Sequence, residues 1–179
     1  GTFNDSTASS GDFNQGADIY VKDMVTGAVK LGSSDAKGLS AANNGAVNDP
    51  ALSADGQYLV FTSTSTKLVP DMHGTAYTNI YLKNLQTGAI ELIATNEQGE
   101  RANAQSNGAV FSADGRYLFF KSNAENLSNE TKYFWNIFRK DLQTGAIVKV
   151  TTDANGQGNT GIDGSNKNVA VSADGRYAV

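Results

Sequence analysis

One phrase occurs three times along the chain. It reads SADGQYLV at 53–60, SADGRYLF at 112–119 and SADGRYAV at 172–179, so successive copies begin 59 and 60 residues apart. A second phrase follows nearly the same period, as DIYVKDMVTGAVKL, NIYLKNLQTGAIEL and NIFRKDLQTGAIVKV, beginning at residues 18, 79 and 136. A fixed period of this length predicts an array of similar structural units.

Each phrase is typical of a β-hairpin. In QYLVFTS (57–63) aromatic and β-branched residues fill both alternating sets of positions, which favours a strand buried on both faces. Asp55 and Gly56 supply the turn before this strand, and a glycine-containing turn at 86–88 joins the two strands of the second phrase. Each repeat is therefore predicted to contain four antiparallel strands.

Four short strands per repeat predict the fold class. An all-β chain of β-propeller blades fits this pattern better than a β-sandwich that reuses one hairpin, because two phrases recur in one order. The chain contains the equivalent of about three blades. The expected units are a half blade at 1–45, a blade at 46–106, a blade at 107–165 and a half blade at 166–179.

Three blades would turn too sharply to close into a ring, since propellers usually have four to eight. We expect that this segment continues in a longer chain, or that two copies join head to tail into a six-bladed ring. In the second case SADGRYAV of one copy would pair with the ADIYVKD strand of the other and bury its open edge.

Four motifs carry a family resemblance that covers nearly the whole chain. They are the S-A-D-G-R-Y turn, Asn126-Leu127, D-L-Q-T-G at 141–145 and ANAQSNGAV at 102–110. Together they resemble the WD40-like or TolB-like propeller repeats of bacterial secreted and envelope proteins. The resemblance implies a propeller fold in a secreted, periplasmic or cell-surface bacterial protein, and it implies little about function.

The same family often carries an Asp-x-Asn-Gly-x-x-Asp pattern between the second and third strands of a blade. Here the nearest versions are DFNQGAD at 12–18 and DMHGTAYTN at 71–79, and the corresponding stretch NETKYFWN at 129–136 lacks it.

The composition argues against several classes of binding partner. The net charge is −4 and the lysines and arginines are scattered, which argues against nucleic-acid binding. No run of apolar residues approaches the 18 or so of a membrane span. The chain contains no cysteine, so disulfides and thiolate metal sites are excluded.

The motifs favour a protein that is not an enzyme. His73 is the single histidine, and no nucleophile elbow, zinc-binding helix motif or phosphate-binding glycine loop is present. Asp55, Asp114 and Asp174 recur with the repeat, so we expect them to accept backbone N–H groups in turns. The sequence predicts a noncatalytic binding or scaffold module that presents loops to a protein or glycan partner. The alternative is the propeller portion of a larger hydrolase or peptidase, which gates or recruits substrate.

Calcium is the one cofactor that the sequence suggests. Two stretches place hard oxygen ligands at short spacing, although DANGQG at 153–158 has Gly164 where an EF-hand loop would have its bidentate glutamate. Asp and Asn also gather in turns for conformational reasons alone. A third interpretation is thus a calcium-stabilised structural repeat of an extracellular assembly. Its candidate ligands are Asp12, Asn14, Asp18, Asp153, Asn155 and Gln157.

Three aromatic residues form the candidate recognition surface. Tyr133, Phe134 and Trp135 lie in a long loop just before the third strand of a blade. Aromatic side chains on loops are favoured anchors for protein partners or sugar rings. The alternative is that they cover the blade edge or pack against the neighbouring loop.

Overall fold

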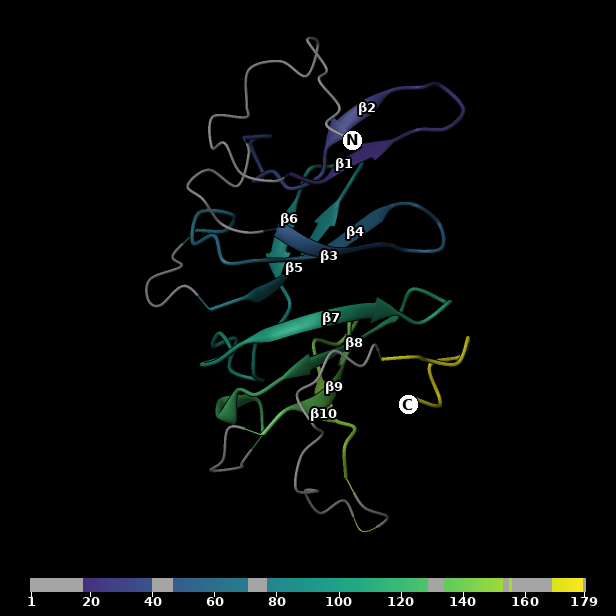
Figure 1. Cartoon of the computed structure of the whole chain (residues 1–179). Helices are drawn as coiled ribbons and strands as arrows, with labels where there is room; N and C mark the ends of the chain where they lie inside the picture. Colours follow the sequence, from purple (N-terminus) through teal and green to yellow (C-terminus); the bar gives the residue numbers. More distant parts are fainter. Residues whose placement is uncertain are drawn as a thin grey trace.

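The computed structural model describes residues 18–39, 47–70, 77–128, 134–152, 155 and 169–178, and its strands form three antiparallel groups (Figure 1). The hairpin consists of β1 (Tyr20–Lys22) and β2 (Val29–Leu31). The first sheet has the order β3 (Val47–Leu52), β4 (Tyr58–Ser63), β5 (Asn79–Asn84), β6 (Ile90–Leu92). The second sheet has the order β7 (Ser106–Phe111), β8 (Tyr117–Ser122), β9 (Asn136–Asp141), β10 (Ile147–Lys149). These sheets confirm the predicted all-β architecture of four-stranded blades.

The third SADG copy folds as a turn beside the second sheet. Val171 and Ala178 form an isolated bridge, and the backbone N–H of Ala113 donates to the Ala173 carbonyl at 3.1 Å. A Cβ atom on Gly175 would lie 3.0 Å from the Tyr117 ring, so the two turns are in close contact. The third copy thus stacks on the second sheet at the place where a following blade would lie.

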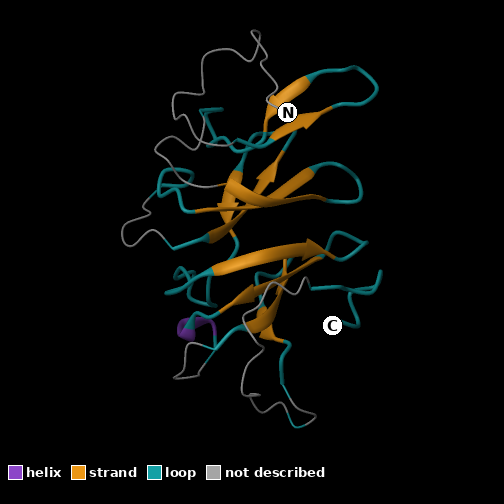
Figure 2. Ribbon diagram, viewed as in Figure 1, coloured by secondary structure: helices purple, strands orange, loops and turns teal. Residues whose placement is uncertain are grey.

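The β1–β2, β3–β4 and β7–β8 turns lie on the right in Figure 1. Two hydrogen bonds tie neighbouring turns together, from the Leu85 N–H to the Gln57 carbonyl and from the Leu142 N–H to the Arg116 carbonyl. Arg116 also forms an ion pair with Asp141 at 2.8 Å. The short 3₁₀ helix η1 (Glu125–Leu127) lies on the opposite side, on the left in Figure 2.

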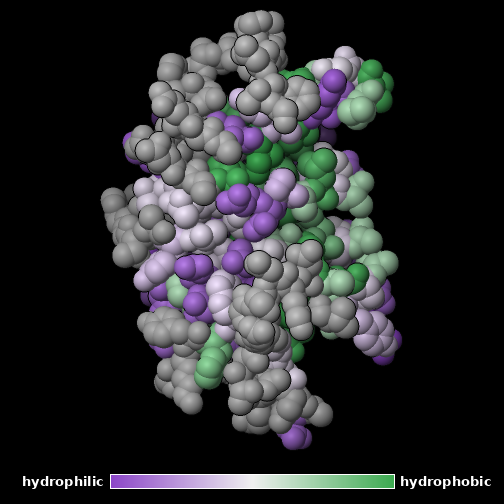
Figure 3. Space-filling model, in the orientation of Figure 1, coloured by the Kyte–Doolittle hydropathy of each residue, from purple (hydrophilic) through white to green (hydrophobic). Residues whose placement is uncertain are grey.

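The core lies in the seams between the groups of strands. At the first seam, Ile19 and Val21 of the hairpin pack against a buried cluster of the first sheet that includes Phe61 and Tyr81. Figure 3 shows hydrophobic surface here, between the hairpin and the first sheet. At the second seam, between the two sheets, the buried cluster includes Val60, Ile80, Leu82, Leu118, Phe120 and Phe138. Strand β4 is buried on both faces, as its composition predicted.

An aromatic pair recurs at the same place in both sheets. Phe61 and Tyr81 stack with ring centroids 5.8 Å apart, and Phe120 and Phe138 do so at the same distance. The Tyr81 hydroxyl donates to the Ser65 carbonyl at 2.7 Å, and burial raises the pKa of this hydroxyl. The two blades therefore repeat side-chain geometry as well as strand order.

A β-bulge also recurs, in the first strand of each sheet. The pairing register shifts between Asn48 and Ala51 in β3 and between Asn107 and Val110 in β7. Within these bulges, Asp49 has a φ of 51° and Gly108 a φ of 65°. A backbone conformation that usually requires glycine is thus held by an aspartate in one blade.

The SADG turns bear out the predicted role of their aspartates. Ser53 Oγ donates to Asp55 Oδ1 at 2.6 Å, and the same carboxylate oxygen accepts the Gln57 N–H at 3.0 Å. The other two copies repeat both bonds, through Asp114 and Asp174. The serine hydroxyl, followed by the backbone N–H, lowers the pKa of each carboxyl group.

Candidate functional site

A buried lysine crosses each seam. Lys83 Nζ of β5 donates to the carbonyl and the hydroxyl of Ser34, both at 2.8 Å, and to the Asp35 carbonyl at 2.9 Å. Lys140 Nζ of β9 donates to the Thr95 carbonyl at 3.3 Å and to its hydroxyl at 3.0 Å. Burial lowers the pKa of both ammonium groups. Lys83 is 5% exposed and Lys140 is 9% exposed. The lysines connect each sheet to the loop that leaves the preceding blade.

Sequence reasoning missed these lysines, although a signal was present. The strand phrase carries a lysine at its fifth position in every copy, where Lys22 is the exposed member in β1. A charged residue that recurs inside an otherwise apolar strand indicates a repeated structural contact.

The loops that follow β2 and β6 each contain a turn in which a side chain accepts backbone N–H groups. Asp35 Oδ1 accepts the N–H groups of Lys37 and Leu39, and Asn96 Oδ1 accepts those of Gln98 and Glu100 at 3.1 and 2.8 Å. These bonds satisfy backbone donors inside the loop and fix its shape. The two residues after Asp35 or Asn96 are exposed, so they are available to make other contacts.

Asn126 of η1 makes two hydrogen bonds at the second seam. Its Oδ1 accepts the Asn103 N–H at 2.9 Å, and its Nδ2 donates to the Arg101 carbonyl at 2.7 Å. The next residue, Leu127, is buried in the core cluster of this seam. The Asn-Leu motif therefore has a structural role, which joins η1 to the chain that enters the second sheet.

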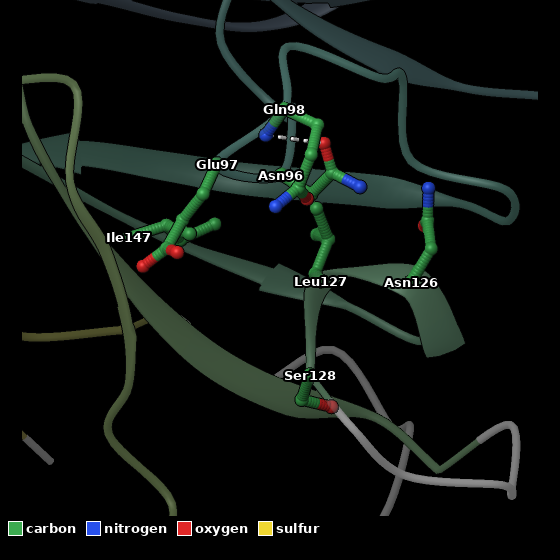
Figure 4. A pocket seen from close by; sticks show the side chains of 7 residues that line it. All are labelled: Asn96, Glu97, Gln98, Asn126, Leu127, Ser128 and Ile147. Atoms are coloured by element: carbon green, nitrogen blue, oxygen red, sulfur yellow. Dashed lines mark hydrogen bonds between the residues drawn. The ribbon is translucent and has the colours of Figure 1, made fainter.

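A pocket with a volume of about 310 Å³ opens at the second seam, between the loop after β6 and η1 (Figure 4). In this view the Leu127 side chain points toward Asn96. Polar groups dominate the lining, and Leu127 and Ile147 supply its apolar part. The residues that line it are Asn96, Glu97, Gln98, Asn126, Leu127, Ser128 and Ile147.

Three polar side chains in this lining are free for a ligand. The Glu97 carboxylate, the Gln98 amide and the Ser128 hydroxyl make no hydrogen bond within the part of the chain that the structure describes. The side chains of Asn96 and Asn126, in contrast, are already bonded within the fold. The pocket thus offers one anionic acceptor, one amide and one hydroxyl.

The loops at the two seams differ in their contact with the next blade. At the first seam the Ala36 carbonyl lies 3.7 Å from the position of a Cβ on Gly88, so the loop contacts the β5–β6 turn. At the second seam nothing lies within 4 Å of the corresponding position on Gly145. The first loop also carries Lys37 where the second carries Gln98. Sequence reasoning missed this pocket, because the difference depends on loop placement rather than on a motif.

The predicted aromatic surface is described in part. Phe134 is 42% exposed and Trp135 is half-buried, whereas Tyr133 lies outside the described residues. The Phe134 carbonyl accepts a bond from Asn136 Nδ2 at 3.0 Å, as the Tyr77 carbonyl does from Asn79 Nδ2. Ser128 of the pocket and Phe134 lie on either side of the undescribed residues 129–133. The pocket residue and the aromatic residues therefore belong to the same connection, between β8 and β9.

The structure places two of the six candidate calcium ligands. The Asp18 carboxylate accepts the Ser33 hydroxyl at 2.5 Å, just as Asn136 Oδ1 accepts the Thr151 hydroxyl at 2.8 Å. Asn155 is exposed. His73 and the ligand candidates Asp12, Asn14, Asp153 and Gln157 lie outside the described residues. Within the described ranges no three His, Cys, Asp or Glu side chains are grouped to hold a metal ion.

Repeated four-stranded sheets, joined through buried seams, define this chain as a β-propeller module. Two solved structures have a similar fold. TolB from Acinetobacter baumannii matches with a TM-score of 0.50 and 22% identity over 89% of this chain and 34% of its own. The tricorn protease matches with a TM-score of 0.52 and 16% identity over 88% of this chain and 12% of its own. The fold is therefore that of a TolB-like propeller, and the chain spans about a third of TolB.

Two further comparisons found nothing. No family model matches the sequence, and no curated protein does. Across the described ranges, no helix is both long and apolar enough to span a membrane.

Proposed function

We propose that this chain is a noncatalytic binding module and that the pocket at the second seam is its recognition site. The observation that carries the proposal is one cavity lined by Glu97, Gln98 and Ser128, three polar side chains without partners in the described residues. Small-molecule sites are concave and use a few placed polar groups to orient the ligand, and this pocket offers such groups beside Leu127 and Ile147.

Comparison of the blades supports this assignment. Polar residues that recur, such as the turn aspartates and the seam lysines, are occupied by hydrogen bonds of the fold. Glu97 and Gln98 replace Ala36 and Lys37 of the preceding loop, and the loop shape is retained because Asn96 makes the same turn as Asp35. A chemical change at an unchanged backbone is expected where a repeat has acquired a binding role.

The aromatic residues extend the proposed surface. Phe134 and Trp135 stand at the end of the same connection that begins beside Ser128. Aromatic side chains on such a connection suit a protein or glycan partner. The resemblance of the repeat motifs supports a secreted, periplasmic or cell-surface location for the protein.

A second candidate is the propeller portion of a larger hydrolase or peptidase. The fold likeness to a protein named as a protease favours this candidate, although the chain corresponds to only 12% of that protein. In that case the same pocket would recruit or gate substrate for a catalytic domain elsewhere. Sequencing the complete gene separates the two, because a domain with a nucleophile downstream would contradict the noncatalytic proposal.

A fragment screen tests the proposed site without assuming a ligand. We expect small polar fragments, titrated into the ¹⁵N-labelled chain, to shift the amide signals of residues 96–98 and 126–128. The corresponding positions at the first seam, 35–37 and 67–69, serve as the internal control. Equal responses at both seams, or none at either, would contradict the proposal.

A further inference from the structure

We infer that the pocket at the second seam binds a single sugar ring of a glycan. This inference rests on the proposed function and specifies the ligand of the same site. It follows from the mixture of hydrogen-bonding groups, the charge, the apolar lining and the size of the cavity.

The unpartnered groups require a ligand that both donates and accepts. The Glu97 carboxylate can only accept hydrogen bonds, the Gln98 amide has an acceptor oxygen and two donor N–H groups, and the Ser128 hydroxyl does both. A sugar ring presents several hydroxyl groups in different directions, each of which can donate and accept. It can therefore offer a matching partner to each kind of group in the lining.

Other ligand classes match this set less well. An anion would be repelled by Glu97, and the lining contains no lysine or arginine to offset that charge. A simple ammonium group would pair with Glu97 but leave the Gln98 N–H groups without an acceptor. A wholly apolar ligand would remove three polar side chains from water without replacing their hydrogen bonds.

The rest of the lining also suits a sugar. Leu127 and Ile147 supply only a small apolar part of a mostly polar lining, which suits a ligand covered with hydroxyl groups, and both pack on the core cluster of the seam. The volume of about 310 Å³ is at the lower end of small-molecule sites, which run from roughly 300 to 1,000 Å³. One ring with its hydroxyl groups fits this size better than a long chain does.

The first seam lacks this set of groups. Its loop offers Ala36 and Lys37 in place of Glu97 and Gln98, and Lys67 stands where Asn126 stands. The same fold thus contains a matched position without the proposed chemistry, and this position supplies the control for the experiment.

The test is an NMR titration of the ¹⁵N-labelled chain with glucose, galactose, mannose and N-acetylglucosamine. Ethylammonium and acetate serve as cation and anion probes. We expect at least one sugar to shift the amide signals of residues 96–98 and 126–128 with a dissociation constant of about 1–10 mM, typical of a single small ligand with few contacts. Neither ion should produce the same response.

Two variants locate the binding. Glu97→Ala and Gln98→Ala are changes at exposed loop positions and should leave the thermal unfolding of the chain unchanged. Each should weaken sugar binding, and loss of the Glu97 contact should weaken it about tenfold or more, because hydrogen bonds to charged groups are the stronger ones. Lys37→Ala at the first seam should leave sugar binding unchanged.

The outcomes separate this inference from the proposed function. If ethylammonium or other fragments bind at the second seam and none of the sugars does, the inference is wrong and the binding module stands. If nothing binds at this seam, both are wrong. Sugar binding that survives both alanine variants would place the sugar elsewhere and overturn the inference.

Discussion

Lys83 and Ser34 join two groups of strands across the first seam. Lys83 Nζ lies 2.8 Å from both the carbonyl oxygen and the hydroxyl oxygen of Ser34. Lys140 makes the corresponding contacts with Thr95 at the second seam. Because the contact recurs, we attribute it to the stacking of blades rather than to a binding site.

Replacing Lys83 tests this structural role. Lys83→Met leaves the Ser34 and Asp35 carbonyl groups without their buried donor, so we expect the free energy of unfolding to fall by about 1–3 kcal/mol. Urea denaturation measures the change. Lys22→Met is the matched control, since Lys22 holds the same position in β1 and is exposed, and it should change stability by less than about 0.5 kcal/mol. Equal effects of the two substitutions would refute the role of the seam contact.

The paired bulges make a second prediction. Gly108→Ala should destabilise the chain by about 1–2 kcal/mol, because φ is 65° and the new Cβ would lie 3.0 Å from Lys121 Cε. Asp49→Gly is the reciprocal change, at the same bulge of the first sheet, where φ is 51°. It relieves the positive φ but removes the 3.3 Å bond from Thr62 Oγ1 to the Asp49 carboxylate, so the thermal midpoint should change little. A loss of stability from Asp49→Gly, with none from Gly108→Ala, would contradict the account of the bulge.

The aromatic loop gives a third prediction. The double replacement Tyr133→Ser with Trp135→Ser should weaken binding of an oligosaccharide that extends beyond one ring, while single-ring binding at the pocket remains. The thermal midpoint should change little if these rings form a recognition surface. A large fall of the midpoint would instead mean that they are covered parts of the fold. Phe134 is 42% exposed and belongs to the same proposed surface, so Phe134→Ser should also weaken oligosaccharide binding with little change of the midpoint.

Calcium supplies a fourth prediction. The sequence Asp153-Ala154-Asn155-Gly156 aligns with Asp35-Ala36-Lys37-Gly38 and with the Asn96 loop, where the first residue bonds backbone N–H groups. This likeness in sequence favours a turn motif over a calcium-binding motif at 153–156. The thermal midpoint measured by calorimetry should be the same with Ca²⁺ and with EGTA, and a clear rise with Ca²⁺ would support a bound ion instead.

The fold was predictable from the sequence because its signals are local and repeated. Asp55 and Gly56 specify a turn, the strand after them has apolar residues on both faces, and the spacing of the copies indicates stacked blades. Other features were predictable in principle but missed, such as the lysine shared by all strand phrases. The bulge at Asp49 gave no such signal, because aspartate alone does not specify a positive φ.

The candidate site was beyond sequence reasoning for a physical reason. The pocket depends on how far the loop at Asn96–Gly99 stands from the turn at Gly145, and the corresponding loop at the first seam, with similar turn chemistry, lies against Gly88. Glu97 and Gln98 look like ordinary exposed loop residues until Ser128 and Leu127 are placed opposite them. The aromatic residues stood out in the sequence, whereas these short polar side chains did not.

A loop exchange between the two seams tests the central claim most directly. The double variant Glu97→Ala with Gln98→Lys gives the second loop the two exposed residues of the first, and retaining Asn96 keeps both the side-chain turn and its bond to Glu100. The measurement is the NMR titration of this variant with the sugar that shifts residues 96–98 and 126–128 most strongly in the unaltered chain. The account predicts an unchanged thermal midpoint and loss of that response, whereas an undiminished response at the second seam would show that these side chains do not form the recognition site.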